Sequence, residues 1–165
     1  MGIRIALNED LPRLVEIYNQ AIAAGQRTGD TVPMTIEDRK GWIESHTADK
    51  YPILVEEKDK SISGYLTISA YRPGRAALRH TAEVSFYVDF DCHRQGVASR
   101  LLRHAIELCP TLELKTLFAI LMESNTASIE YLKSFGFEHW AHLPRVADYD
   151  GVEVGQVYYG LRVDC

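Results

Sequence analysis

Four stretches of the chain place apolar residues three or four positions apart, the spacing that builds one face of an α-helix. The first of them runs from Leu11 to Ile22. The second follows residues 35–38, which resemble a capping box, and its thin apolar face carries Trp42 and Ile43. A helix with so little apolar surface is expected at the surface of the molecule or beside a cleft.

Two further helices are predicted in the second half of the chain. One opens at Gly96 and is stopped by Pro110, and the other begins at Asn125 and ends at Gly136, in the left-handed position that glycine favours at a helix end. Each follows a segment that is typical of a strand. This order of elements favours an α/β arrangement.

The remaining apolar segments are short, rich in β-branched and aromatic residues, and bounded by turn residues, which predicts strands. They cover residues 3–6, 53–55, 62–69, 82–88, 116–121, 137–145 and 152–162. The sequence contains no linker, repeat or low-complexity tract between them. We therefore expect one α/β domain over residues 1–165, built on a mixed sheet.

The composition agrees with a single globular domain and argues against several functions. With 165 residues, 46% of them hydrophobic and 25% charged, the chain can bury one core. A net charge of -5 offers no basic surface for nucleic acid, and no apolar run is long enough to span a membrane. The N-terminus has no charged-then-apolar leader, so we expect a cytoplasmic protein.

The cysteines and histidines show no metal-binding spacing. Cys92, Cys109 and Cys165 are odd in number and form no CxxC pair, so we expect reduced thiols. His139 and His142 come closest to a pair, but three residues apart in a strand they should lie on opposite faces. We expect no metal cofactor.

Residues 82–98 combine the features of an anion-binding turn. A predicted strand leads through residues 93–98 into a helix, whose first N–H groups point outward at the positive end of the helix dipole. Gly96 and Ala98 would allow a phosphate to approach closely, and Arg94 adds a charge. The glycine motifs of nucleoside-triphosphate and dinucleotide sites are absent. Taken alone, the turn is equally consistent with a structural glycine.

A second stretch, NTASIEYLKSFGF at residues 125–137, changes this balance. Together with HRQGVA at residues 93–98, it resembles the acetyl-CoA-binding core of the GNAT superfamily of N-acetyltransferases. Segments at 51–55, 71–75 and 81–85 resemble the phosphinothricin acetyltransferase branch of that superfamily. The resemblance covers nearly the whole chain. It implies a mixed, mostly antiparallel sheet of about seven strands with about four flanking helices, in which the fourth and fifth strands splay apart.

The resemblance also implies where acetyl-CoA would bind as a co-substrate. Main-chain groups of three strand residues would pair with the pantetheine arm, and main-chain amides of the turn would hold the pyrophosphate. The Asn125 side chain would bind farther along the cofactor, although Asn is also a common helix N-cap. The strand residues are Phe86, Tyr87 and Val88, and the turn residues are Arg94, Gln95, Gly96, Val97, Ala98 and Ser99.

The sequence departs from the family pattern at three positions. His93 stands where Arg or Gln is usual, Leu132 where the superfamily often has Tyr and the branch has His, and Leu78 where the branch has Tyr. The last two changes affect the acid–base machinery and the substrate pocket. Candidate replacement acids, for each of which core packing is the alternative role, are Tyr131, Tyr158 and Tyr159.

Glu83 is the candidate general base. It lies on a predicted strand between apolar neighbours, beside the expected splay, where loss of solvent would raise its pKa toward working pH. The alternative is a strand glutamate that faces solvent. Main-chain N–H groups of Tyr87 or Val88 would stabilise the oxyanion of the reaction.

Arg72 and Arg75 are the candidate substrate-binding residues, because the branch places in this loop the group that holds the acidic end of the acceptor. A guanidinium fork suits a carboxylate or phosphinate, and two solvated loop arginines are the alternative. The resemblance thus implies a homodimeric N-acetyltransferase that acts directly on the primary amine of a small amino acid-like compound, similar to phosphinothricin or methionine sulfoximine. The open alternatives are a peptide or protein N-terminal acetyltransferase and a non-catalytic acyl-CoA-binding sensor module.

Overall fold

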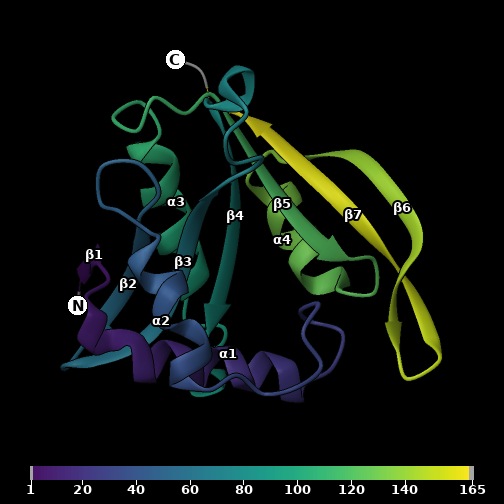
Figure 1. Cartoon of the computed structure of the whole chain (residues 1–165), viewed down its shortest axis with the longest axis horizontal. Coiled ribbons are helices and arrows are strands. Elements are labelled where there is room, and N and C mark those ends of the chain that lie inside the picture. Colours follow the sequence, from purple (N-terminus) through teal and green to yellow (C-terminus); the bar gives the residue numbers. More distant parts are fainter. Residues whose placement is uncertain (1, 164–165) are drawn as a thin grey trace.

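A seven-stranded sheet in the order β1-β2-β3-β4-β5-β7-β6 forms the centre of the molecule in the computed structural model, which describes residues 2–163 (Figure 1). Neighbouring strands run antiparallel except β4 and β5, which are parallel. The strands are β1 (Gly2–Ile5), β2 (Ile53–Lys58), β3 (Ser61–Ala70), β4 (Thr81–Val88), β5 (Thr116–Met122), β6 (Glu138–Tyr149) and β7 (Val152–Arg162). The helices are α1 (Leu11–Ala23), α2 (Ile36–Glu44), α3 (Val97–Leu108) and α4 (Thr126–Ser134). The fold expected from the sequence is confirmed.

Two layers of helices cover the two faces of the sheet. On one face, Leu66 of β3 and Val84 of β4 belong to the core that includes Leu101 of α3 and residues of α4. On the other face, Tyr65 of β3 packs in a second core with Leu14 of α1 and residues of α2. Because successive side chains of a strand point to opposite faces, each residue of β4 contributes to one layer or to the other.

The second helix has the character that its sequence predicts. The Oγ1 of Thr35 accepts a hydrogen bond from the N–H of Asp38 at 3.2 Å, and the Asp38 carboxylate accepts one from the N–H of Thr35 at 2.8 Å. The predicted capping box is thus confirmed. Ile43 is the buried residue of α2, and Trp42 stays partly exposed beside a pocket.

The prediction that His139 and His142 lie on opposite faces is wrong. A β-bulge between His139 and Ala141 shifts the register, so that the two histidines pair with Tyr159 and Val157 of β7. These partners are two residues apart, which places both histidines on one face. Even so, no three His, Cys, Asp or Glu residues within 2–163 are grouped in a way that could hold a metal ion.

Two other expectations concern the cysteines and membrane segments. Cys109 is buried, with its Sγ donating to the carbonyl of Ala105, and Cys92 is partly exposed. The third cysteine of the expected reduced set, Cys165, lies outside the described residues. None of the helices within residues 2–163 has the length and apolar character needed to cross a membrane.

Candidate active site

The strands β4 and β5 separate soon after they begin, and they leave a gap in the middle of the sheet. Only Thr81, Ala82 and Glu83 of β4 have partners in β5, and the arrowheads of the two strands point apart in Figure 1. Beyond residue 83 the main chain of β4 therefore has a neighbouring strand on one side, β3, within the described part of the chain. Unpaired main-chain groups of this kind require partners of another origin when they are buried.

The alternation of the backbone decides which residues of β4 point into this gap. The N–H of Asp89 donates to the carbonyl of Ser63 at 2.9 Å, so the main chain at residue 89 faces β3. Every second residue shares that direction in an antiparallel ladder, which turns Tyr87 toward β3 and leaves Phe86 and Val88 facing the gap. The carbonyl of Val88 accepts a hydrogen bond from Nε2 of His93 at 3.0 Å. The free donors predicted at residues 86–88 are therefore the N–H groups of residues 86 and 88.

Side chains narrow the gap to a crevice of about 50 Å³. The buried Asn125 lines it, and its Oδ1 accepts hydrogen bonds from Ser128 N at 3.5 Å and from Arg27 Nη1 at 2.6 Å. Asn125 therefore caps α4, as its position predicts, and also faces the crevice. Arg27 lies in an irregular loop with no motif around it, so no sequence signal marks it as a site residue. The full lining comprises Arg27, Val84, Ser85, Phe86, Tyr87, Ala119, Ile120, Leu121, Asn125 and Ser128.

The turn before α3 has the geometry of an anion site. Gly96 is the N-cap residue with φ 77°, and Arg94 has φ 60°, so two residues of the turn are left-handed. Arg94, Gln95 and Gly96 are exposed, Val97 is buried, and the first N–H groups of a helix have no partner within it. The predicted residues 94–99 are thus contiguous around one helix N-terminus.

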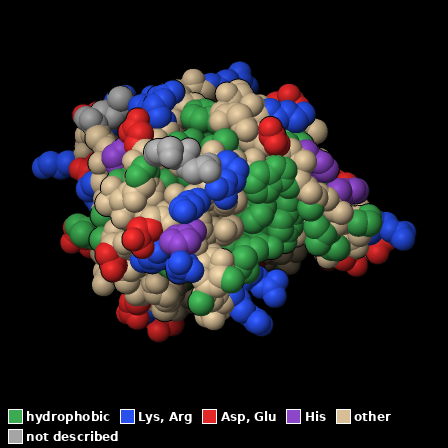
Figure 2. Space-filling model, turned by 90° about the horizontal axis from the view of Figure 1, so that it is seen from above, with side chains coloured by type: hydrophobic (Ala, Val, Ile, Leu, Met, Phe, Trp, Pro, Cys, Tyr) green, Lys and Arg blue, Asp and Glu red, His purple; other side chains and the backbone are tan. Residues whose placement is uncertain are grey.

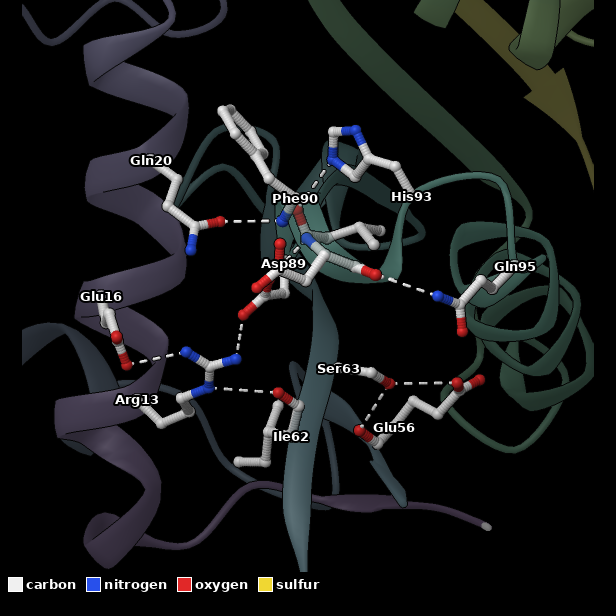
Figure 3. Close-up of polar contacts among 12 residues, drawn as sticks. Arg13, Glu16, Gln20, Glu56, Ile62, Ser63, Asp89, Phe90, His93 and Gln95 are labelled. Atoms are coloured by element: carbon white, nitrogen blue, oxygen red, sulfur yellow. Dashed lines mark hydrogen bonds and ion pairs between the residues drawn. The ribbon is translucent and has the colours of Figure 1, made fainter. Parts of the chain in front are cut away.

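A network of side chains holds this turn to the rest of the molecule (Figure 3). Asp89 accepts from the N–H of Asp91 at 2.8 Å and pairs with Arg13 of α1. Gln95 Nε2 donates to the carbonyl of Asp91 at 2.9 Å, and Gln20 of α1 accepts from the N–H of Phe90 at 3.0 Å. His93 holds the end of β4 through its ring, because its Nε2 bonds to the carbonyl of Val88. This is the position where the resemblance leads one to expect Arg or Gln.

Glu83 lies at a second cavity, on the α1–α2 face of the sheet. This cavity has a volume of about 250 Å³ and is lined by Tyr18, Asp30, Arg39, Trp42, Tyr65, Thr67, Ser69, Glu83, Ser85 and Tyr87. No hydrogen-bond or ion-pair partner of the Glu83 carboxylate is present among the described residues. Burial raises the pKa of Glu83, because the charged form loses solvent without gaining a counter-charge. Such a group is a typical general base.

Aromatic rings form the walls of this pocket. The ring of Tyr87 lies 4.9 Å from that of Tyr18 and 5.4 Å from that of Tyr65, and the Tyr65 and Trp42 rings are 6.2 Å apart. The Tyr18 hydroxyl bonds to Asp30 and to Thr28 Oγ1, the latter at 2.6 Å. The loop after α1 is thereby tied to the pocket.

The pocket and the crevice share two residues of β4, Ser85 and Tyr87. Glu83 is the last residue of β4 that pairs with β5, so it lies directly beside the point where the sheet opens. The structure does not bring Arg72 and Arg75 to either space. Both are exposed and line a separate hollow of about 380 Å³ that also includes Leu78.

The position that often carries a tyrosine acid in the superfamily has no polar function in this chain. Leu132 is fully buried in the core between α4 and the sheet. Its neighbour Tyr131 packs against the ring of Phe86 at 5.3 Å, and its buried hydroxyl has no hydrogen-bond partner among the described residues. Tyr158 contacts the ring of Phe118, and Tyr159 is buried in the core. Of the three candidate acids, Tyr131 is the one whose ring contacts the ring of Phe86, while Tyr158 and Tyr159 are strand partners of Ile120 and Ala119 on the β5 side of the crevice.

Comparison with known proteins gives consistent results. Residues 3–154 match the family model described as an acetyltransferase (GNAT) domain. A Bacillus subtilis (strain 168) protein provisionally named as phosphinothricin acetyltransferase, YwnH, is 35% identical over 151 residues, which cover 92% of each chain. The Escherichia coli (strain K12) L-amino acid N-acyltransferase MnaT is 29% identical over 99% of this chain and 95% of its own. A solved structure from Salmonella typhimurium, yncA, is provisionally described as an acetyltransferase with its cofactor acetyl-CoA. It superposes with a TM-score of 0.91 at 27% identity, over 99% of this chain and 94% of that one.

Proposed function

Because the chain belongs to the GNAT acetyltransferase family, we propose that it transfers the acetyl group of acetyl-CoA directly to the primary amine of a small amino acid-like acceptor, with Glu83 as the general base. The observation that carries this proposal is that the acceptor pocket and the β4–β5 crevice share one wall. The pocket that contains Glu83 and the crevice between β4 and β5 both include Ser85 and Tyr87. An amine in the first space would meet a thioester in the second.

The unpaired main chain of β4 beside the crevice marks the path proposed for the arm of acetyl-CoA, which supplies the acetyl group as a thioester when it is bound. Main-chain groups of Phe86 and Val88 face the gap and would pair with the amides of the arm, as an added strand does. The N–H groups from Arg94 to Ser99 would hold the pyrophosphate at the N-terminus of α3. The amide of Asn125 would bind along the same path.

Glu83 would take a proton from the acceptor ammonium, either directly or through one water molecule. Its partly buried carboxylate has a raised pKa, which makes it a stronger base than a solvated glutamate. The neutral amine would then attack the acetyl carbonyl. One of the two gap-facing N–H groups, of Phe86 or Val88, would donate to the oxygen that becomes negatively charged, and the other would pair with the arm.

The leaving thiolate places modest demands on the enzyme. A thiol with an ordinary pKa of about 8.5 leaves without full protonation, and this agrees with the absence of an acid at Leu132. The Tyr131 hydroxyl would supply the proton that converts the thiolate to free coenzyme A. Its ring contact with Phe86, which lines the crevice, supports this role, and burial raises the pKa of Tyr131 and keeps its hydroxyl protonated.

The size of the acceptor pocket favours a small substrate. A volume of about 250 Å³ lies below the roughly 300–1,000 Å³ that drug-sized ligands occupy. Relatives named for phosphinothricin, methionine sulfoximine and L-amino acids point to the same class. We therefore favour free amino acid analogues over peptide N-termini.

A panel of amines tests the proposal. Release of free coenzyme A from acetyl-CoA is measured with phosphinothricin, L-methionine sulfone, standard L-amino acids and short peptides. We expect turnover with at least one amino acid analogue and its loss in Glu83→Gln. Tight binding of acetyl-CoA without release for any amine would instead identify a sensor module.

A homodimer also remains part of the proposal. Leu78 and Trp140 are large apolar side chains with 37% and 41% of their surface exposed. Figure 2 shows apolar side chains gathered into a patch on the face seen from above. Light scattering coupled to size-exclusion chromatography measures the mass in solution, and a monomer at micromolar concentration contradicts this part of the proposal.

A further inference from the structure

The guanidinium of Arg39 has no counter-ion among residues 2–163. It lines the pocket of Glu83 from α2 and is partly buried. Two carboxylates, Asp30 and Glu83, line the same pocket, and neither forms an ion pair with Arg39 within the described residues. By contrast, Arg4 is paired with Glu57 at 2.6 Å and Arg100 with Glu56 at 2.7 Å. A partly buried and unpaired cation inside a pocket indicates an anionic ligand.

Two aromatic rings confine this guanidinium. Its Cζ lies 4.2 Å from the ring centre of Tyr18 and 4.8 Å from that of Trp42, which is one helical turn further along α2. Contacts with ring faces stabilise the cation and leave its in-plane N–H donors unused. The group is thus held in position before any ligand arrives, and this lowers the entropy cost of binding.

The charge of Arg39 acts on the whole pocket. Burial raises the pKa of Tyr18, Tyr65 and Tyr87, and the positive charge of Arg39 opposes that rise in all three. These hydroxyls belong to α1, β3 and β4, which surround the cavity. The pocket therefore contains a positive field from α2 and a base without a counter-charge on β4.

We propose that Arg39 binds the carboxylate next to the acceptor amine and so directs that amine to Glu83. This inference rests on the proposed acetyl transfer and adds the residue that selects the substrate class. A planar guanidinium fork matches both oxygens of a carboxylate. Arg72 and Arg75, the candidates from the sequence, line another hollow. The assignment moves the recognition of the acid from the loop after β3 to helix α2.

The pocket also presents a competing arrangement. Asp30, Glu83 and the aromatic rings are groups that bind a cationic ligand, in which case Arg39 would serve only to position Tyr18 and Trp42. A monoamine without a carboxylate would then be the better acceptor. The two arrangements predict opposite preferences.

A matched pair of acceptors distinguishes them. L-Methionine sulfone and its decarboxylated analogue, 3-(methylsulfonyl)propylamine, differ only in the carboxylate. For the unmodified protein we expect kcat/KM to be about tenfold to a hundredfold higher for the acid, the range that hydrogen bonds to charged groups supply. In Arg39→Gln this preference should fall to about one, through a higher KM for the acid and with little change for the amine. Arg39→Lys should restore part of it, because it keeps the charge without the fork.

The controls separate folding from recognition. Lys40→Gln removes the neighbouring exposed cation of α2, which pairs with Glu37, and should leave the preference intact. The dissociation constant for acetyl-CoA, measured by calorimetry, should be the same in Arg39→Gln and in the unmodified protein. A preference that persists in Arg39→Gln, that disappears in the double variant Arg72→Gln/Arg75→Gln instead, or that favours the decarboxylated amine overturns the inference.

Binding keeps the inference independent of turnover. L-Methionine sulfone is titrated into each protein in the presence of coenzyme A. If no amine is acetylated, the proposed function fails, but binding of the acid by the unmodified protein and its loss in Arg39→Gln still support the anion site. Equal binding by both proteins, or no binding by either, contradicts it.

Discussion

The crevice beside β4 and the pocket next to it are built from different kinds of groups. The crevice is lined by β4, by residues 119–121 of β5, by the start of α4 and by Arg27, and the groups proposed to bind the cofactor there and in the turn before α3 are mainly main-chain N–H groups. The pocket instead offers side chains from α1, the following loop, α2, β3 and β4. A site made of main chain tolerates changes of side chain, such as His93, as long as the backbone keeps its course. A site made of side chains changes its ligand with each substitution.

Removal of the carboxylate at residue 83 should have the largest effect, and it acts on the pocket alone. We expect Glu83→Gln to lower kcat by about 10²–10⁴-fold, the usual contribution of a general base. The dissociation constant for acetyl-CoA should stay unchanged, because the crevice uses other groups. Steady-state rates and calorimetry measure the two quantities, and an unchanged kcat would rule out Glu83 as the base.

The pH dependence sharpens the same contrast. Glu83 acts when ionised, so kcat/KM should fall by about tenfold per pH unit below its raised pKa. Glu83 binds a proton more readily in the folded protein than in the unfolded chain. Its contribution to stability therefore falls as the pH rises from the ordinary pKa of glutamate through the raised pKa of the folded state. Glu83→Gln should therefore melt at a higher temperature than the unmodified protein at neutral pH, and the difference should disappear in acid. Melting curves at several pH values check this, and a lower melting temperature at neutral pH would contradict it.

A change to the backbone of the turn should affect the crevice side and spare the pocket. Gly96 has φ 77°, and an added Cβ would lie 2.9 Å from Arg100 Nη1. Gly96→Ala should cost about 1–2 kcal/mol of stability, the usual cost of a left-handed non-glycine residue. It should raise the KM for acetyl-CoA several-fold while the acceptor KM stays constant. Denaturant unfolding and steady-state kinetics measure these effects, and Gly151→Ala, at a surface turn with φ 89°, is the control.

The smallest effect is expected at the exposed Arg94. Its charge adds to the potential at the N-terminus of α3 but is well solvated. We expect Arg94→Gln to raise the KM for acetyl-CoA about twofold to fourfold at low salt, an amount in keeping with an exposed ion pair. The difference should vanish near 0.5 M salt. An effect that is independent of salt would mean that the guanidinium binds in a desolvated contact.

The sequence predicted the local features of the molecule well. The capping box of α2, the start of α3 at Gly96, the left-handed Gly136 and the strand that carries Glu83 each depend on a few neighbouring residues. The acceptor pocket depends on contacts between segments that are distant in the sequence. Its residues follow the patterns of ordinary core or surface positions. Tyr18 falls on the apolar face of a helix, and Arg39 lies in a polar helix whose charges the sequence pattern assigns to the surface. Sequence patterns identify such residues as core or surface, and only the packing of α1 and α2 on the sheet brings them together.

The register of β6 and β7 shows the same limit. A single extra residue near Trp140 reverses the faces expected for the two histidines. No turn signal or glycine marks the bulge in the sequence. The ring of Trp140 lies where a side chain at Gly160 would be, with a constructed Cβ at 2.0 Å from Trp140 Cε3. The irregularity is thus linked to a glycine twenty positions away.

Alternate side chains of β4 point to the apolar core and to the acceptor pocket, so the two faces of this strand have different chemical requirements. Deletion of Ala82, with the preceding residues held in place, would turn Glu83 toward the apolar core and Val84 toward the acceptor pocket. One-residue insertions or deletions in β4 should therefore not be tolerated, and functional variants should keep the length of the strand and the face of each side chain. Related enzymes should diversify by substitutions in the side chains of α1 and α2 that line the acceptor pocket. Such substitutions would change the acceptor and leave the crevice proposed for acetyl-CoA as it is.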